Sequence, residues 1–114
     1  MLVLVVVLLV VCGKGVYSKD IIQVGFISNS SSMNSAHSVY ALNDYIYVAG
    51  YISDSLTIID VFDKTTPTQV GYLSNASLNG ATSVYVLGDY AYVAGYFSDS
   101  LTIIDISDKQ LQHK

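Results

Sequence analysis

Hydrophobic residues follow two different patterns along the chain. Residues 2–12 form an unbroken apolar run, whereas beyond residue 21 apolar and aromatic residues come in short groups separated by Asn, Asp, Gly and Ser. Short groups rich in Tyr, Val and Ile between turn-forming residues are typical of β-strands. No segment outside residues 2–12 has helical periodicity. The chain is therefore predicted to be all-β, preceded by an N-terminal apolar segment.

The strand pattern occurs twice. Residues 38–64 and 83–109 align at a constant offset of 45, and they differ at six positions: 41/86, 43/88, 46/91, 52/97, 61/106 and 62/107. The similarity extends backwards, because residues 24–29 resemble residues 70–75 at an offset of 46. A repeat of about 40 to 45 residues with short strands and tight hairpins is typical of the blades of β-propellers.

The first repeat shows where the strands should lie. Asn43-Asp44, replaced by Gly88-Asp89 in the second repeat, predicts a two-residue hairpin turn, because Asn and Gly tolerate positive φ. Pro67 cannot donate a ladder hydrogen bond, so we expect it in a loop. We expect strands over residues 39–42, 45–51, 56–61 and 69–74.

Neither face of these strands is polar. The strand over 45–51 has Tyr45, Tyr47, Ala49 and Tyr51 on one face and Ile46, Val48 and Gly50 on the other. A sheet with one solvated side would alternate apolar with charged residues, so we expect these sheets to be covered on both sides. Stacked antiparallel four-stranded sheets of this kind are the blades of β-propellers.

The expected blades are incomplete. We expect blade units at 37–81 and 82–114, with 22–28 as an outer strand separated from its own blade. This strand could complete the sheet formed by residues 83–106, which would give two four-stranded sheets. Each sheet would still leave one apolar face uncovered. The sequence therefore predicts an incomplete propeller that is either a piece of a longer protein or associates with copies of itself.

Two short motifs carry a family resemblance. The LTIID sequence at 56–60 and 101–105 resembles the motif of the LVIVD-repeat family, with Thr in place of Val at the second position. The DYIYVA and DYAYVA sequences before it resemble that family's preceding strand, although YVTN-type propeller repeats have similar strands. The family's usual Asp-Pro after the motif is replaced by Asp-Lys. The resemblance covers most of residues 22–109 and implies a propeller-type repeat of prokaryotic surface and secreted proteins.

Residues 1–18 are predicted to be a signal peptide or N-terminal hydrophobic leader. The apolar run of residues 2–12 spans about 16 Å as a helix, which suits a signal peptide and is too short for a membrane span. Cleavage is expected after Ser18 or after Gly13, and retention of the leader or a lipid anchor on Cys12 remains an alternative. The predicted localisation is extracytoplasmic, either secreted or at the cell surface.

Charge and cysteine content exclude several function classes. The net charge is −4 with five Lys and no basic cluster, which argues against nucleic acid as a partner. Cys12 is the only cysteine, so a chain that begins at Lys19 would have neither disulfides nor thiol catalysis.

The remaining candidate chemistry has a structural interpretation in each case. Repeated aspartates suggest calcium, but no calcium-loop spacing is present, so we expect them to accept hydrogen bonds from turn amides. His37 is replaced by Thr82 in the second repeat, and His113 lies in a polar tail, so neither is predicted to be catalytic. Asn29 and Asn75 begin N-x-[ST] sequons whose glycosylation stays undecided. The aspartates are Asp44, Asp54, Asp60, Asp63, Asp89, Asp99, Asp105 and Asp108.

The tyrosines are expected to pack between blades with their hydroxyls at the rim, although a stacking platform for sugars or peptides is the alternative. They are Tyr40, Tyr45, Tyr47, Tyr51, Tyr85, Tyr90, Tyr92 and Tyr96.

We therefore predict a non-enzymatic, extracytoplasmic repeat module for protein interaction or surface scaffolding, within a larger β-propeller. It is assigned no catalytic, cofactor-binding or metal-binding residue. Its partner would be a protein or surface, which contacts the loops around 29–36, 52–55 and 62–68 and their second-repeat equivalents. The alternatives are a fragment of a propeller enzyme whose catalytic residues lie outside this chain, and a self-assembling repeat protein.

Overall fold

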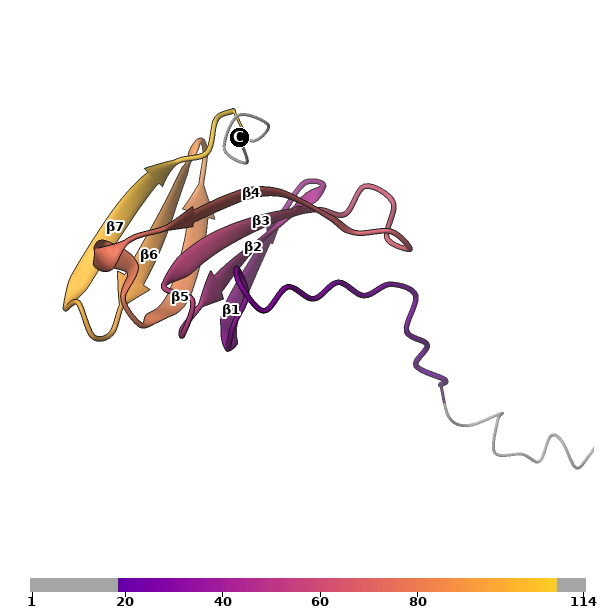
Figure 1. Ribbon diagram of the computed structural model, residues 1–114. Helices are drawn as coiled ribbons and strands as arrows, with labels where there is room; N and C mark the ends of the chain where they lie inside the picture. Colours follow the sequence, from indigo (N-terminus) through magenta and orange to yellow (C-terminus); the bar gives the residue numbers. More distant parts are fainter. Residues whose placement is uncertain (1–18, 109–114) are drawn as a thin grey trace, which may run out of the picture.

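Two antiparallel β-sheets pack against each other in the computed structural model, which describes residues 19–108 (Figure 1). Sheet A has the order β1-β2-β3-β4 and sheet B the order β5-β6-β7. The elements are β1 (Ala36–Leu42), β2 (Tyr45–Gly50), β3 (Ser55–Asp60), β4 (Thr68–Ser74), the 3₁₀ turn η1 (Ala76–Leu78), β5 (Ala81–Leu87), β6 (Tyr90–Gly95) and β7 (Ser100–Asp105). The predicted leader, its Cys12, and His113 lie outside the described residues. Within residues 19–108 no helix is long and apolar enough to cross a membrane.

The strand assignments made from sequence are confirmed, with end points that shift by a few residues. The two-residue hairpin turns are also confirmed: Asn43 has φ 57° and Gly88 has φ 60°. Pro67 lies in the loop immediately before β4. The all-β fold with two repeats is therefore as expected, but two sheets do not close into a ring.

The core lies between the sheets and comes from one face of each. From sheet A it contains the buried side chains of Tyr47, Ala49, Leu56 and Ile58. From sheet B and its flanking turns it contains Leu78, Ala81, Val84, Val86, Ala91, Val93, Ile104 and Ile106. In β5 the alternation is regular: Val84 and Val86 are buried, whereas Tyr85 and Leu87 are exposed. Each sheet thus has one face in the core and one face that no other sheet covers.

Residues 22–28, which could have completed the second sheet, do not form its fourth strand in the structure. Sheet B has three strands, and residues 19–29 belong to no strand. Residues 22–28 instead run in an extended path beside the outer face of sheet A (Figure 1). There Gly25 approaches the Lys64 carbonyl so closely that an added Cβ would collide with it, and Pro67 is the next neighbour. The physical reason lies in the loop that follows, which is attached to the end of sheet A as described below.

Candidate interaction surfaces

A buried backbone carbonyl organises the loop between residue 28 and β1. The Ser32 carbonyl oxygen accepts hydrogen bonds from Ser55 Oγ at 2.7 Å, Thr57 Oγ1 at 2.8 Å and Ser53 Oγ at 3.2 Å. Ser55 and Thr57 alternate along β3, so both side chains point to the same side of the strand. We call this arrangement the carbonyl clamp. It fixes the loop on sheet A, so the chain segment before the loop leaves along the outer face of that sheet.

The second repeat has the same clamp. The Ser77 carbonyl oxygen accepts from Ser100 Oγ at 2.7 Å, Ser98 Oγ at 3.0 Å and Thr102 Oγ1 at 3.1 Å. The repeated SDSLT sequence, which we assigned to a turn and the start of a strand, therefore has a specific structural function. Sequence reasoning missed it, although the identity of all five residues between the repeats was a visible signal.

A glutamine on the fourth strand of sheet A adds a second attachment to the first loop. Gln69 Oε1 accepts from Ser32 Oγ at 2.8 Å and from Asn29 Nδ2 at 3.2 Å. Asn29 Oδ1 in turn accepts from the Ser31 backbone nitrogen at 2.9 Å. In the second loop Asn75 Oδ1 accepts from the Ser77 nitrogen at 3.0 Å. Within residues 19–108 sheet B has no fourth strand, so no equivalent of Gln69 contacts this loop there.

The sequon asparagines thus have structural contacts within their loops. In Asn29 the Nδ2 atom, to which a glycan would be attached, donates to Gln69. This interaction gives Asn29 a role in the loop that does not depend on glycosylation.

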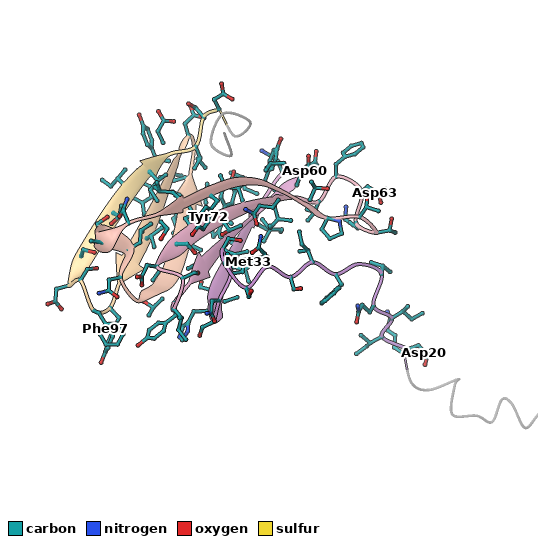
Figure 2. The ribbon with its side chains drawn as sticks, in the orientation of Figure 1. Asp20, Met33, Asp60, Asp63, Tyr72 and Phe97 are labelled. Atoms are coloured by element: carbon teal, nitrogen blue, oxygen red, sulfur yellow. The ribbon has the colours of Figure 1, made fainter. Side chains whose placement is uncertain are left out.

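The aspartates at strand ends accept hydrogen bonds from nearby amides, as predicted. Asp60 accepts from the Phe62 nitrogen, Asp63 from the Thr65 nitrogen and Asp105 from the Ser107 nitrogen, at 2.8, 3.0 and 2.8 Å. Hydrogen bonds from Thr65 lower the pKa of the Asp63 carboxyl group, and hydrogen bonds from Ser107 lower that of Asp105. Asp60 and Asp63 lie near the β3–β4 loop at one end of sheet A (Figure 2).

One aspartate joins the two sheets. Asp54 Oδ1, in the turn between β2 and β3, accepts from the Gly80 backbone nitrogen at 3.1 Å, just before β5. Across the range 19–108, no three or more His, Cys, Asp or Glu side chains gather in a metal-binding arrangement.

The loops expected to contact partners lie at opposite ends of sheet A. The loop around 29–36 and the turn around 52–55 are joined by the carbonyl clamp and by a hydrogen bond from the Ile52 nitrogen to the Asn34 carbonyl at 3.1 Å. At this same end His37 stacks on the Tyr51 ring, with centroids 5.1 Å apart. The loop around 62–68 lies at the other end of the sheet (Figure 1).

The tyrosines of the two repeats have different environments. Tyr47 is fully buried in the core, which agrees with the core interpretation, whereas Tyr85, Tyr90 and Tyr96 are exposed. Tyr40 and Tyr85 meet edge to face with centroids 4.9 Å apart. The expectation that the hydroxyls lie at the rim is wrong for Tyr47, because its hydroxyl is buried without a hydrogen-bond partner among the described residues.

Tyr47→Phe is expected to raise the free energy of unfolding by about 1 kcal/mol, because it removes an unsatisfied buried hydroxyl group. Burial raises the pKa of Tyr47 from 10.0 to about 12, with a smaller contribution from Tyr45. Because the pKa of Tyr47 is higher in the folded chain than in the unfolded chain, ionisation of Tyr47 favours unfolding. The wild-type free energy of unfolding should therefore be at its full value below pH 10 and decrease as the pH rises towards 12, whereas Tyr47→Phe should lack this decrease. Urea unfolding between pH 8 and 12 measures both effects. Tyr92→Phe is the matched control, and a destabilised Tyr47→Phe variant would contradict the prediction.

One uncovered face belongs to sheet B and is rich in large apolar side chains. We call it the open face; it consists of Tyr85, Leu87, Tyr90, Tyr92, Leu101 and Ile103. Leu101 is 66 % exposed and Ile103 is 59 % exposed. Their first-repeat equivalents, Leu56 and Ile58, are both 1 % exposed, because they face sheet B. The same side chains are therefore core in one repeat and surface in the other.

The other uncovered face belongs to sheet A. We call it the outer face; it consists of Val39, Ala41, Ile46, Val48, Ile59 and Val61. The extended residues 23–27 and Pro67 border it and enclose a groove of about 590 Å³. On this face Val39 is 63 % exposed, whereas Val48 is 9 % exposed and Ile59 is 3 % exposed. Residues 22–28 and their neighbours therefore cover part of the face and leave the region of Val39 open.

The two repeats thus share three strands, the turns between them and the carbonyl clamp, and the LTIID sequence lies in β3 and in β7. The family of the LVIVD repeat matches residues 34–74 and 80–110. The chain belongs to the LVIVD-repeat family. No curated protein and no solved structure matches it.

The two LVIVD repeats explain the departure from the family motif at its second position. The residue there is Thr57 in the first repeat and Thr102 in the second, and both hydroxyl groups donate to the carbonyl clamp. Valine at this position would have the same branched shape but no donor. Threonine at this position therefore binds a backbone carbonyl of the loop that precedes β1 or β5.

Proposed function

We propose that this chain is a non-enzymatic interaction module, whose working surfaces are the open face of sheet B and the outer face of sheet A. The observation that carries the proposal is the exposure of Leu101 and Ile103, which are large apolar residues on one continuous sheet face. Extended apolar patches of this kind mark interaction sites in soluble proteins. An LVIVD-repeat module with two such faces fits a role inside a larger propeller-like assembly.

The polar residues that the fold gathers support a non-enzymatic role. The hydroxyl groups of Ser53, Ser55 and Thr57 converge on the Ser32 carbonyl and hold a loop. The carboxylates of Asp54 and Asp60 accept hydrogen bonds from backbone amides. These polar groups form contacts within the fold. The open face, by contrast, exposes large apolar side chains such as Leu101 and Ile103, which suits binding to a protein.

We further propose that the module works outside the cytoplasm. The proposal rests on the leader-like sequence of residues 1–18, which lies outside the described residues. The mass of the mature protein tests it: a product that begins near Lys19 supports export, and an uncleaved chain retained inside the cell contradicts it.

Binding of a hydrophobic fluorescent dye to the full chain at nanomolar concentration tests the interaction surface. We expect strong dye fluorescence, because at this dilution both apolar faces should be free of partners. The double variant Leu101→Lys/Ile103→Lys should lose about half of the signal, and Lys substitutions of the already exposed Ser83 and Ala94 on the same sheet face serve as the matched control. A folded wild-type chain that binds no dye would overturn the proposal.

A further inference from the structure

The two uncovered faces are related to each other through the repeat. The open face of sheet B is the second-repeat equivalent of the face of sheet A that forms the core, and the outer face of sheet A is the first-repeat equivalent of the core face of sheet B. The contact between sheets A and B therefore joins one face equivalent to the open face and one face equivalent to the outer face.

The residues of the open face are identical to their first-repeat equivalents, which are buried in the core or partly buried against it. Tyr85, Leu87, Tyr90, Tyr92, Leu101 and Ile103 correspond to Tyr40, Leu42, Tyr45, Tyr47, Leu56 and Ile58. Of the six positions that differ between residues 38–64 and 83–109, none falls on this face. A surface that only faced solvent would have no physical reason to keep the side chains of a core.

The opposing face differs at three positions, but the differences compensate. Sheet A has Ala41, Ile46 and Val61 where sheet B has Val86, Ala91 and Ile106. The first two of each set are direct cross-strand partners, Ala41 with Ile46 and Val86 with Ala91. The large and small side chains are thus exchanged while the total apolar volume is kept, which is the kind of change that a packed surface tolerates best.

We propose, on the basis of the proposed function, that the partner of both faces is a second copy of this chain. The open face of one copy packs on the outer face of the next, as sheet A packs on sheet B within the chain. Residues 22–28 of the next copy then add to the edge of β7 that pairs with no strand in the described part of the chain, and become the fourth strand of sheet B.

The hydrogen-bonding groups needed for this arrangement are present. Residues 22–28 resemble β4, and Gln23 is the equivalent of Gln69 at the offset of 46. Gln69 holds Asn29 and Ser32 within the chain. In the assembly Gln23 of one copy would hold Asn75 and Ser77 of the other, which completes the second loop. A free β-strand edge also recruits an extended segment readily.

The contact between sheets through Asp54 has an unused equivalent as well. Asp54 Oδ1 accepts from the Gly80 nitrogen. Asp99 is the second-repeat equivalent of Asp54, and Ser35 is the first-repeat equivalent of Gly80. These two residues lie far apart in one chain, so the equivalent hydrogen bond would form between two copies. Asp54 and Asp99 both have positive φ, 53° and 52°, so the two turns present their carboxylates alike. Asp99 of one copy is therefore expected to accept from Ser35 of the next.

Disulfide cross-linking between two populations of the full chain, both carrying Cys12→Ser, tests the arrangement. Leu56 pairs with Leu73 in β3 and β4, and the equivalent pair between copies is Leu101 with Ile27. Mixing Leu101→Cys chains with Ile27→Cys chains should give a covalent dimer in most of the material after mild oxidation. Phe62→Cys, in an exposed loop, replaces Ile27→Cys in the control mixture and should give none.

Light scattering on the aspartate variants provides the second measurement, with glycine as the replacement because both turns have positive φ. Asp99→Gly should weaken self-association about tenfold or more and leave the unfolding of the dilute monomer unchanged, whereas Asp54→Gly should destabilise that monomer. A wild-type chain that remains monomeric at high concentration and does not cross-link would overturn this inference. If the dye still bound in that case, the interaction module would stand and its partner would be a different protein or further repeats.

Discussion

Ile58→Ala is expected to lower the free energy of unfolding by about 2–5 kcal/mol, the range for a large core side chain truncated to alanine. Ile58 is 1 % exposed and packs in the cluster between the two sheets. Its removal leaves a cavity, because the facing residues of sheet B are fixed in their strands. Chemical denaturation of the full chain at low concentration, where it is monomeric, measures the effect.

The second repeat provides a control with the same chemical change. Ile103 is the equivalent isoleucine in β7, and it is 59 % exposed. In the dilute monomer Ile103→Ala should change the free energy of unfolding by less than about 1 kcal/mol, because little apolar surface leaves the core. Equal losses for the two variants would contradict the assignment of the two faces. With rising protein concentration the effect of Ile103→Ala should grow if copies of the chain associate.

Gly50→Ala is expected to be the most destabilising single-methyl insertion in the first repeat, at about 3 kcal/mol or more. An added Cβ would collide with Ser53 Oγ and lie 2.7 Å from Ser55 Oγ and 3.2 Å from the Ser32 carbonyl oxygen. The insertion therefore displaces the donors of the carbonyl clamp. Overpacking costs about 1–3 kcal/mol, and each hydrogen bond that is lost adds roughly 1 kcal/mol. Thermal and urea unfolding measure the total.

The control for Gly50→Ala is a glycine in open space. Gly88 has no heavy atom within 4 Å of an added Cβ, although its φ of 60° disfavours most side chains. Asn43 occupies the equivalent turn position at φ 57°, so Gly88→Asn should shift stability by less than about 1 kcal/mol. Gly95→Ala should behave like Gly50→Ala, because it meets the second clamp at Ser98 and Ser100. A mild effect of Gly50→Ala would show that the clamp is not rigid.

Local signals in the sequence are sufficient for the strands and turns. The Tyr- and Val-rich composition of Tyr45–Gly50 and the turn residues Asn43 and Gly88 are local signals, so the sequence predicts this strand and the two turns directly. The repeat also predicts that each sheet has two apolar faces. These features are the part of the fold that follows from the sequence.

The course of residues 22–28 depends on contacts far along the chain. The carbonyl of Ser32 bonds to donors more than 20 residues away, and Gln69 reaches back 37 residues to Ser32. Such long-range pairings leave no local pattern in the sequence. The resemblance of residues 24–29 to β4 therefore predicts an extended segment, but it does not predict where that segment lies in the fold. The buried hydroxyl of Tyr47 is missed for the same reason, since burial of a single atom depends on the facing sheet.

The presence of two sheets in each chain restricts the symmetry of any closed assembly. If each copy contributes two blades and the contact between copies repeats the contact within one, the operation that relates neighbours is a single rotation. Closed propellers have about four to eight blades, so only rings with an even number of blades are accessible, which corresponds to two-, three- or fourfold cyclic symmetry. If the operation between neighbours does not close into a ring, the same contact would instead propagate as an open helical filament.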